Sequence, residues 1–142
     1  MIIALGGDHA GFSLKKELIS YISSLGYFSK DFGPFSEESC DYPDFAHQVA
    51  SSVAAMELDL GFLVCGSGNG VAMTANKHSD IRAALCWNPE SARLSRAHNN
   101  ANILCLPARF ISLEEAKEIS RVFLETKFEE GRHFSRVQKI NL

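Results

Sequence analysis

The sequence lacks the features that mark membrane, secreted and nucleic-acid-binding proteins. No apolar stretch approaches the roughly 20 residues that span a bilayer. A short apolar run at the amino terminus gives way to Gly-Gly-Asp, so we expect neither a signal peptide nor a membrane span. The net charge of −3 lacks the excess of Lys and Arg that nucleic-acid or anionic-membrane surfaces require. We therefore expect neither nucleic acid nor a membrane as a partner.

The four cysteines lack C-x-x-C spacing, so neither a structural zinc site nor a disulfide framework is indicated. In a chain without an expected secretion signal, they are typical of reduced thiols, and we expect a cytoplasmic protein. We expect Cys86 and Cys105 to act as small core hydrophobes. With 142 residues, 46% of them hydrophobic, the chain predicts one domain over 1–142.

Short apolar runs alternate with longer amphipathic segments along the chain. Strands are predicted over 2–5, 27–32, 60–64, 81–86 and 103–106, and helices over 12–25, 43–56, 69–77, from 89 onward, and from 112 to 126. Asn88 before Pro89 predicts a helix start, Ser112 with Glu115 matches a capping box, and Gly26 closes a helix. This alternation predicts an α/β fold, a three-layer, doubly wound, five-stranded parallel sheet that is Rossmann-like.

The most informative stretch is Leu60–Gly70, an apolar run that ends in Cys65 and continues into a loop with Gly at every second position. A strand that delivers a thiol into a turn of free amides, just before a helix, is suited to holding an anion. A thiol in such a place is more readily deprotonated, so Cys65 is a candidate nucleophile or base. The alternative is a buried cysteine used only for packing.

Two better-known phosphate loops do not fit this stretch. A nucleoside-triphosphate loop needs Lys and Ser or Thr after its last Gly, but Val71 follows Gly70. A dinucleotide fingerprint would place its third Gly at Val71. What survives is a general anion site for a phosphate, a carboxylate or an enolate oxygen.

In doubly wound folds, ligands collect at the carboxyl ends of strands. Asp8 and His9 follow the first predicted strand and lie between glycines, although such residues also serve as ordinary turn caps. His98 follows the fourth predicted helix, where a histidine needs no function. Arg132 and Arg136 would share one face of a helix and could bind a single phosphate, or belong to a solvated tail. We place His47 and His78 on helices without chemistry.

The chain resembles the type B ribose-5-phosphate isomerases and their hexose-6-phosphate relatives. The matches run in family order over nearly the whole chain: 7–11, 41–44, 65–70, 75–77, 81–84, 96–102, Arg132 and Arg136. The resemblance implies an aldose–ketose isomerase of the pentose phosphate pathway that uses no metal and no cofactor. It also implies a homodimer whose active sites are shared between subunits.

The resemblance also implies a division of labour. Cys65 would move the proton between C2 and C1, Asp8 and His98 would assist ring opening, and Ser67 would stabilise the enediolate. The substrate would also be contacted by the loop residues Gly66, Gly68, Asn69 and Gly70. Tyr42 and Asn99 would contact the sugar. The phosphate would be bound by His9, Arg109, Arg132 and Arg136. Preorganised amides can stabilise an enediolate by several kcal/mol.

Some members of this family use Glu after the last loop Gly as the base. That position is Val71 here, so the resemblance implies the cysteine-base type, and Ser67 in place of the frequent Thr keeps the hydroxyl. The hexose-phosphate relatives leave an allose or galactose 6-phosphate as an alternative substrate. A non-catalytic sugar-phosphate-binding module, which would have no use for Cys65, and a cysteine-dependent redox protein or hydrolase are the rivals.

Overall fold

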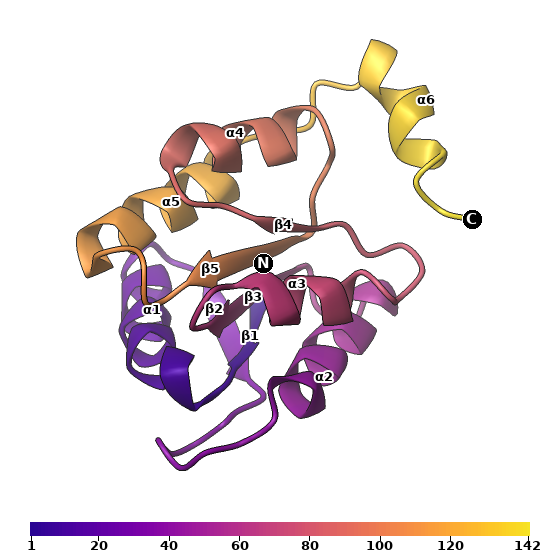
Figure 1. Ribbon diagram of the computed structural model, residues 1–142. Helices are drawn as coiled ribbons and strands as arrows, with labels where there is room; N and C mark the ends of the chain where they lie inside the picture. The colour runs from indigo at the N-terminus through magenta and orange to yellow at the C-terminus, as the bar shows by residue number, and fades with distance from the viewer.

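A five-stranded, wholly parallel sheet forms the centre of the computed structural model, which describes residues 1–142 (Figure 1). The strands lie in the order β2-β1-β3-β5-β4. Their bounds are β1 Ile2–Gly7, β2 Phe28–Asp31, β3 Leu60–Cys65, β4 Ala83–Leu85 and β5 Ile103–Pro107. The predicted doubly wound α/β fold is confirmed.

The helices form two layers around this sheet. Their bounds are η1 His9–Gly11 (a short 3-10 turn), α1 Phe12–Ser24, α2 Tyr42–Ala54, α3 Asn69–Ala75, α4 Pro89–Ala97, α5 Leu113–Glu125 and α6 Arg132–Gln138. Helices α1, α4 and α5 pack on one face, and α2 and α3 pack on the other. Helix α6 stands away from the sheet (Figure 1). None of these helices has the length and apolar character that a membrane crossing demands.

Strand β3 lies at the middle of the sheet, and its alternating side chains supply both hydrophobic cores. Phe62 and Val64 join the core beneath α1 and α5, whereas Leu63 and Cys65 join the core beneath α2 and α3. All four residues are buried, and full burial of one large apolar side chain contributes about 1.5–3 kcal/mol. The strand therefore directs the side chain of Cys65 toward the layer formed by α2 and α3.

The predicted helix starts are confirmed. Asn88 caps α4 through its Oδ1, which accepts from the amide of Ser91 at 2.8 Å. The Oγ of Ser112 accepts from the amide of Glu115 at 3.1 Å. In turn, the carboxylate of Glu115 accepts from the amide of Ser112 at 3.1 Å, which completes the capping box. These caps satisfy amides that a helix start leaves without partners.

A buried lysine holds the segment between β2 and α2. Lys15 is 1% exposed, and its Nζ lies 2.6 Å from Oδ1 of Asp31 and 2.7 Å from the carbonyl oxygen of Pro34. A buried ammonium needs such partners, because its charge is costly to remove from water. The contacts tie the segment that leads toward Tyr42 to helix α1.

The structure corrects two details. Strand β4 covers three residues where six were predicted, and just before it the amide of Arg82 donates to the side-chain Oδ1 of Asn102 at 2.8 Å and not to a backbone carbonyl of β5. Within this edge strand, the side-chain amide of Asn76 exchanges two hydrogen bonds with the backbone of Ala83, at 3.0 and 2.8 Å, and so satisfies groups on its open side. Helix α3 ends at Ala75, so His78 lies in the following turn and not on a helix.

Candidate active site

The thiol of Cys65 is held inside the loop that follows β3. Cys65 is 4% exposed, and its Sγ accepts a hydrogen bond from the amide of Gly68 at 3.2 Å. Gly68 has φ of +75°, a conformation that favours glycine. The Oγ of Ser67 accepts from the amide of Asn69 at 3.3 Å. The loop thus presents a sulfur, a hydroxyl and backbone amides within five residues.

Cys86 and Cys105 differ from Cys65 in their surroundings. Both are buried, and burial raises the pKa of each thiol. Neither sulfur accepts a hydrogen bond from a loop amide. The prediction that these two cysteines serve as core residues is confirmed.

Asp8 lies directly beside the end of β3. Its amide donates to the carbonyl of Val64 at 3.2 Å, and its Oδ1 accepts from the amide of Gly11 at 3.0 Å. A Cβ added at Gly7 or Gly11 would lie 2.2 or 2.1 Å from the oxygen of Val64, so only glycine permits this approach. These glycines explain how the backbone around Asp8 packs directly against the end of β3.

His9 points its two nitrogens in different directions. Its Nδ1 accepts a hydrogen bond from the amide of Cys40 at 3.3 Å. The neutral ring therefore carries its proton on Nε2, which becomes a donor. His9 is half-buried and follows Asp8 at the same edge of the sheet. The ring can donate to an anion bound at this edge.

Tyr42 and Arg109 also reach the loop. A Cβ on Gly70 would lie 2.4 Å from the ring of Tyr42, so the ring rests against the loop backbone. The guanidinium of Arg109 lies beside Gly66, 3.1 Å from the position of a Cβ there. The amide of Arg109 donates to the carbonyl of Gly66 at 3.0 Å. Two side chains from distant segments therefore border the loop that follows Cys65.

The other predicted site residues lie at the opposite edge of the sheet. Ile103 pairs with Gly61 at the start of β3, whereas Pro107 pairs with Cys65 at its end. The four residue-to-residue steps from Gly61 to Cys65 span about 13 Å at 3.3 Å per step. Helices α4 and α5 run back from the carboxyl edge to the opposite edge. The residues that follow them, His98, Asn99, Arg132 and Arg136, are therefore far from the thiol of their own chain.

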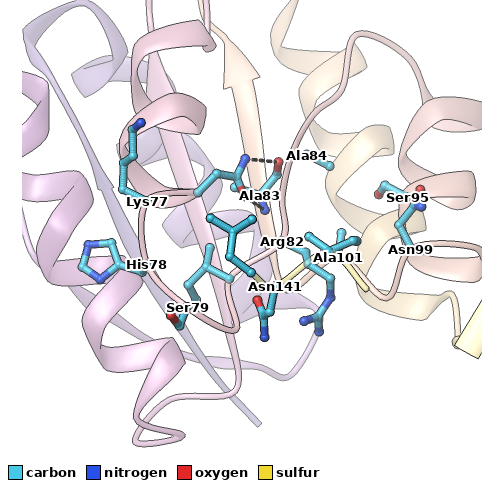
Figure 2. Close-up of a pocket in the computed structure, with 14 residues that line it drawn as sticks. Lys77, His78, Ser79, Arg82, Ala83, Ala84, Ser95, Asn99, Ala101 and Asn141 are labelled. Carbon is cyan, nitrogen blue, oxygen red and sulfur yellow. Dashed lines mark hydrogen bonds between the residues drawn. The ribbon is translucent and has the colours of Figure 1, made fainter. Parts of the chain in front are cut away.

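A groove of about 450 Å³ opens near this second edge (Figure 2). Arg82, Asn99 and His78 contribute to its lining. Arg82 is anchored there, because its Nε donates to the carbonyl of Asn100 at 2.9 Å, and burial lowers its pKa. The guanidiniums of Arg132 and Arg136 are exposed and make no ion pair within the chain. This edge therefore offers free positive charge.

Two histidines, His78 and His133, predict that the stability of the protein depends on pH. Local sequence patterns did not indicate this role. The pKa of each is lowered below 6.5. Burial is the larger cause, and the second is a neighbouring histidine, which is His47 for His78 and His98 for His133. Because their pKa values are lower in the folded protein, these histidines bind protons more readily in the unfolded chain than in the folded one. The free energy of unfolding is therefore highest above about pH 6.5 and decreases as the pH falls through the folded-state pKa values. We expect the urea midpoint, at fixed protein concentration, to fall between about pH 7.5 and 5.5.

The control for this prediction is His78→Gln, which removes one of the two titrating groups. The Nε2 of His78 lies 2.8 Å from Nδ1 of His47, so the glutamine can keep one hydrogen bond. The variant should show a shallower fall in midpoint over the same range. An unchanged midpoint in the wild-type protein would contradict the prediction.

Together, the fold and the site define a class: a doubly wound α/β protein with a buried thiol held in a glycine-rich loop of backbone amides at the carboxyl ends of its strands. The chain belongs to the Ribose/Galactose Isomerase family, whose model matches residues 3–140.

Individual relatives match over almost the entire chain. Ribose-5-phosphate isomerase B of Escherichia coli is 46% identical over 138 residues, which cover 97% of this chain and 93% of that protein. The solved ribose 5-phosphate isomerase of Thermotoga maritima is 48% identical with a TM-score of 0.97, covering 99% of this chain and 97% of that one. Ribose-5-phosphate isomerase B of Mycoplasma genitalium, solved with bound ribulose-5-phosphate, is 42% identical with a TM-score of 0.94, covering 98% and 93%.

Proposed function

We propose that this protein interconverts ribose 5-phosphate and ribulose 5-phosphate through an enediolate, a step of the pentose phosphate pathway. The observation that carries the proposal is the thiol of Cys65 within a loop of amides, in a chain whose relatives at 42–48% identity bear this enzyme's name. All four cysteines are free, which supports a place in the cytoplasm.

In the proposed reaction, the Cys65 thiolate takes the proton from C2 of the open aldose. The electrons of the C–H bond move toward C1, and the carbonyl oxygen becomes an enediolate oxygen. The amides of the loop and the hydroxyl of Ser67 stabilise that charge as it develops. A proton passes from the C2 hydroxyl to the oxygen on C1, and the thiol returns its proton to C1. Such proton transfer needs no metal ion.

The other side chains divide between ring opening and binding. Asp8 and His98 would move the protons that open the furanose ring. Tyr42 and Asn99 would contact the sugar hydroxyls, and the loop amides from Gly66 to Gly70 would hold the reacting oxygens. The phosphate would be bound by His9, Arg109, Arg132 and Arg136. Binding the phosphate away from the reacting carbons holds the flexible open chain in place.

We propose that two chains form each active site. Cys65 and Asp8 lie at one edge of the sheet, and His98 lies at the other, so one chain cannot bring them onto one small sugar. In a dimer with twofold symmetry, each partner can present its second edge to the other's first edge, which closes two equivalent sites. The protruding helix α6, with its unpaired arginines, supports this arrangement (Figure 1).

Replacing Arg136 with Ala should weaken binding more than it slows chemistry. A charge-assisted hydrogen bond to phosphate contributes about 1.5–3 kcal/mol, so we expect KM to rise about 10–100-fold. We expect kcat to stay within about 3-fold, because the phosphate is remote from C1 and C2. Lys139→Ala is the matched control, since Lys139 is an exposed cation at the end of the same helix. Equal effects of the two variants would contradict a specific phosphate contact.

The proposed function is tested by assaying purified protein on ribose 5-phosphate, allose 6-phosphate and galactose 6-phosphate, with EDTA present. We expect turnover of the pentose phosphate in EDTA. The description of the family includes galactose, so turnover of a hexose phosphate alone would assign the sibling specificity. Binding of sugar phosphates without turnover of any of them would favour the non-catalytic module.

A further inference from the structure

Helix α6 packs on the end of helix α4 through His133, and just beyond the helix Asn141 is hydrogen-bonded to Asp80. His133 is the one buried residue of α6. Its ring stacks on the ring of His98, with centroids 4.2 Å apart and planes inclined by 13°. His98 ends helix α4, so the stack joins the ends of two segments that are separated by α5.

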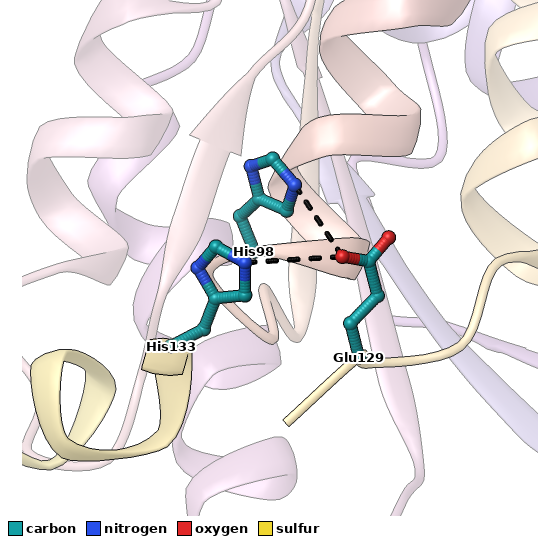
Figure 3. Close-up of side chains that lie close together, drawn as sticks. All are labelled: His98, Glu129 and His133. Carbon is teal, nitrogen blue, oxygen red and sulfur yellow. Dashed lines mark ion pairs between the residues drawn. The ribbon is translucent and has the colours of Figure 1, made fainter. Parts of the chain in front are cut away.

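Glu129 completes this cluster. Its amide donates to the carbonyl of Ala97 at 3.0 Å, which fixes its backbone beside the end of α4. Its Oε1 lies 3.6 Å from Nε2 of His98 and 3.8 Å from Nε2 of His133 (Figure 3). One carboxylate oxygen therefore faces the same nitrogen of both rings.

The ligand types of this cluster, two imidazoles and a carboxylate, are those that zinc prefers. The orientation of the rings argues for another use. A histidine binds a metal through a lone pair in the plane of its ring, at about 2.0–2.1 Å. Two nearly parallel, stacked planes share no such point, so an ion would have to break the stack. The arrangement instead suits a carboxylate that holds two imidazoles.

We propose that Glu129 and His133 are positioning residues that fix the ring of His98 for proton transfer in ring opening. The stack restricts rotation of the His98 ring, and the carboxylate favours a proton on its Nε2. The Nδ1 is then the nitrogen that gives or takes a proton. Proton transfer is sensitive to orientation, and small displacements of a reacting group are costly. This inference rests on the proposed function, in which His98 acts on the ring of the sugar.

The first test is Glu129→Gln, which removes the negative charge and keeps the shape of the side chain. We expect kcat to fall about 10-fold while KM changes less than about 3-fold, because the phosphate contacts are untouched. Glu130→Gln makes the same chemical change one residue along, at a carboxylate without an ion pair, and should behave as wild type. Equal kcat values in the two variants would overturn the proposal.

His133 is tested with a pair of substitutions. His133→Phe keeps an aromatic ring on His98, whereas His133→Ala removes it. We expect His133→Phe to retain several-fold more of the wild-type kcat than His133→Ala. If both raise KM as Arg136→Ala does and leave kcat unchanged, then His133 serves only to place α6, and the positioning of His98 is overturned.

A titration of the imidazole NMR signals provides a readout that does not require activity. In Glu129→Gln, the signals of His133 should titrate at lower pH than in wild type, because the carboxylate no longer favours the protonated ring. The other charges facing the pair, Arg132 and Arg136 on α6 and Glu90 on α4, are unchanged. An unchanged titration midpoint for His133 in Glu129→Gln would overturn the proposal. A wild-type protein that turns over no sugar phosphate would overturn the proposed function. The NMR titration would then test only whether Glu129 interacts with the histidine pair.

Discussion

Replacing Cys65 with Ala lowers kcat for ribose 5-phosphate about 10³-fold and leaves the Kd for the sugar phosphate within about 3-fold of wild type. A positioned general base contributes about 10²–10⁴-fold, and here one group must both remove and return the proton. Alanine keeps the backbone of the loop, whose amides and Gly68 turn would still hold the substrate oxygens. The measurement pairs steady-state kinetics with calorimetric binding to the inactive variant.

Cys86→Ala is the matched control for this loss. Cys86 is buried like Cys65, but it belongs to the opposite core, and burial raises the pKa of its thiol. Removing it should cost stability and leave kcat near wild type. If Cys65→Ala kept wild-type kcat, the thiol would be a packing group, and the enediolate mechanism through Cys65 would be wrong. If it lost binding as well as turnover, the loop itself would have collapsed.

Much of the fold follows from local patterns in the sequence. The continuous apolar stretches around Phe62 and Leu104 are typical of buried parallel strands, and both lie at the centre of the sheet. Asn88 and Ser112 mark helix starts because their side chains can accept from nearby amides. The length of β4 could not be predicted in this way, because the amide of Arg82 at its start donates to the side chain of Asn102, which reaches it through the tertiary fold.

The candidate site was harder to predict from local patterns. The motif around Asp8 and the loop after Cys65 each follow a strand, and the carboxyl-edge rule places both correctly. The rule does not apply to His98, because a helix that covers a parallel sheet returns the chain to the opposite edge. Glu129 and His133 carry no motif of their own. Their relation to His98 arises only when α5 brings the end of the chain back to α4.

A mixed dimer that combines Cys65→Ala in one chain with His98→Gln in the other should recover about half of the wild-type kcat per dimer. In a shared site, one of the two sites receives both intact residues, and the other receives both substitutions. Each parent homodimer has one defect in every site and should keep about 1% of wild-type activity or less. Co-expression with two different tags and purification on both would isolate the mixed dimer.

The control distinguishes shared sites from recovery by refolding or by contamination. Cys65 and Asp8 lie at the same edge, where Asp8 binds the end of β3, so both must enter the same site from the same chain. A mixed dimer of Cys65→Ala and Asp8→Asn therefore has one defect in each site and should stay as inactive as its parents. Recovery in the first mixture and not in the second requires His98 to act across the interface on the substrate held by Cys65. Inactivity of both mixtures would mean that each chain completes its own site, which the 13 Å or so along β3 between the two edges argues against.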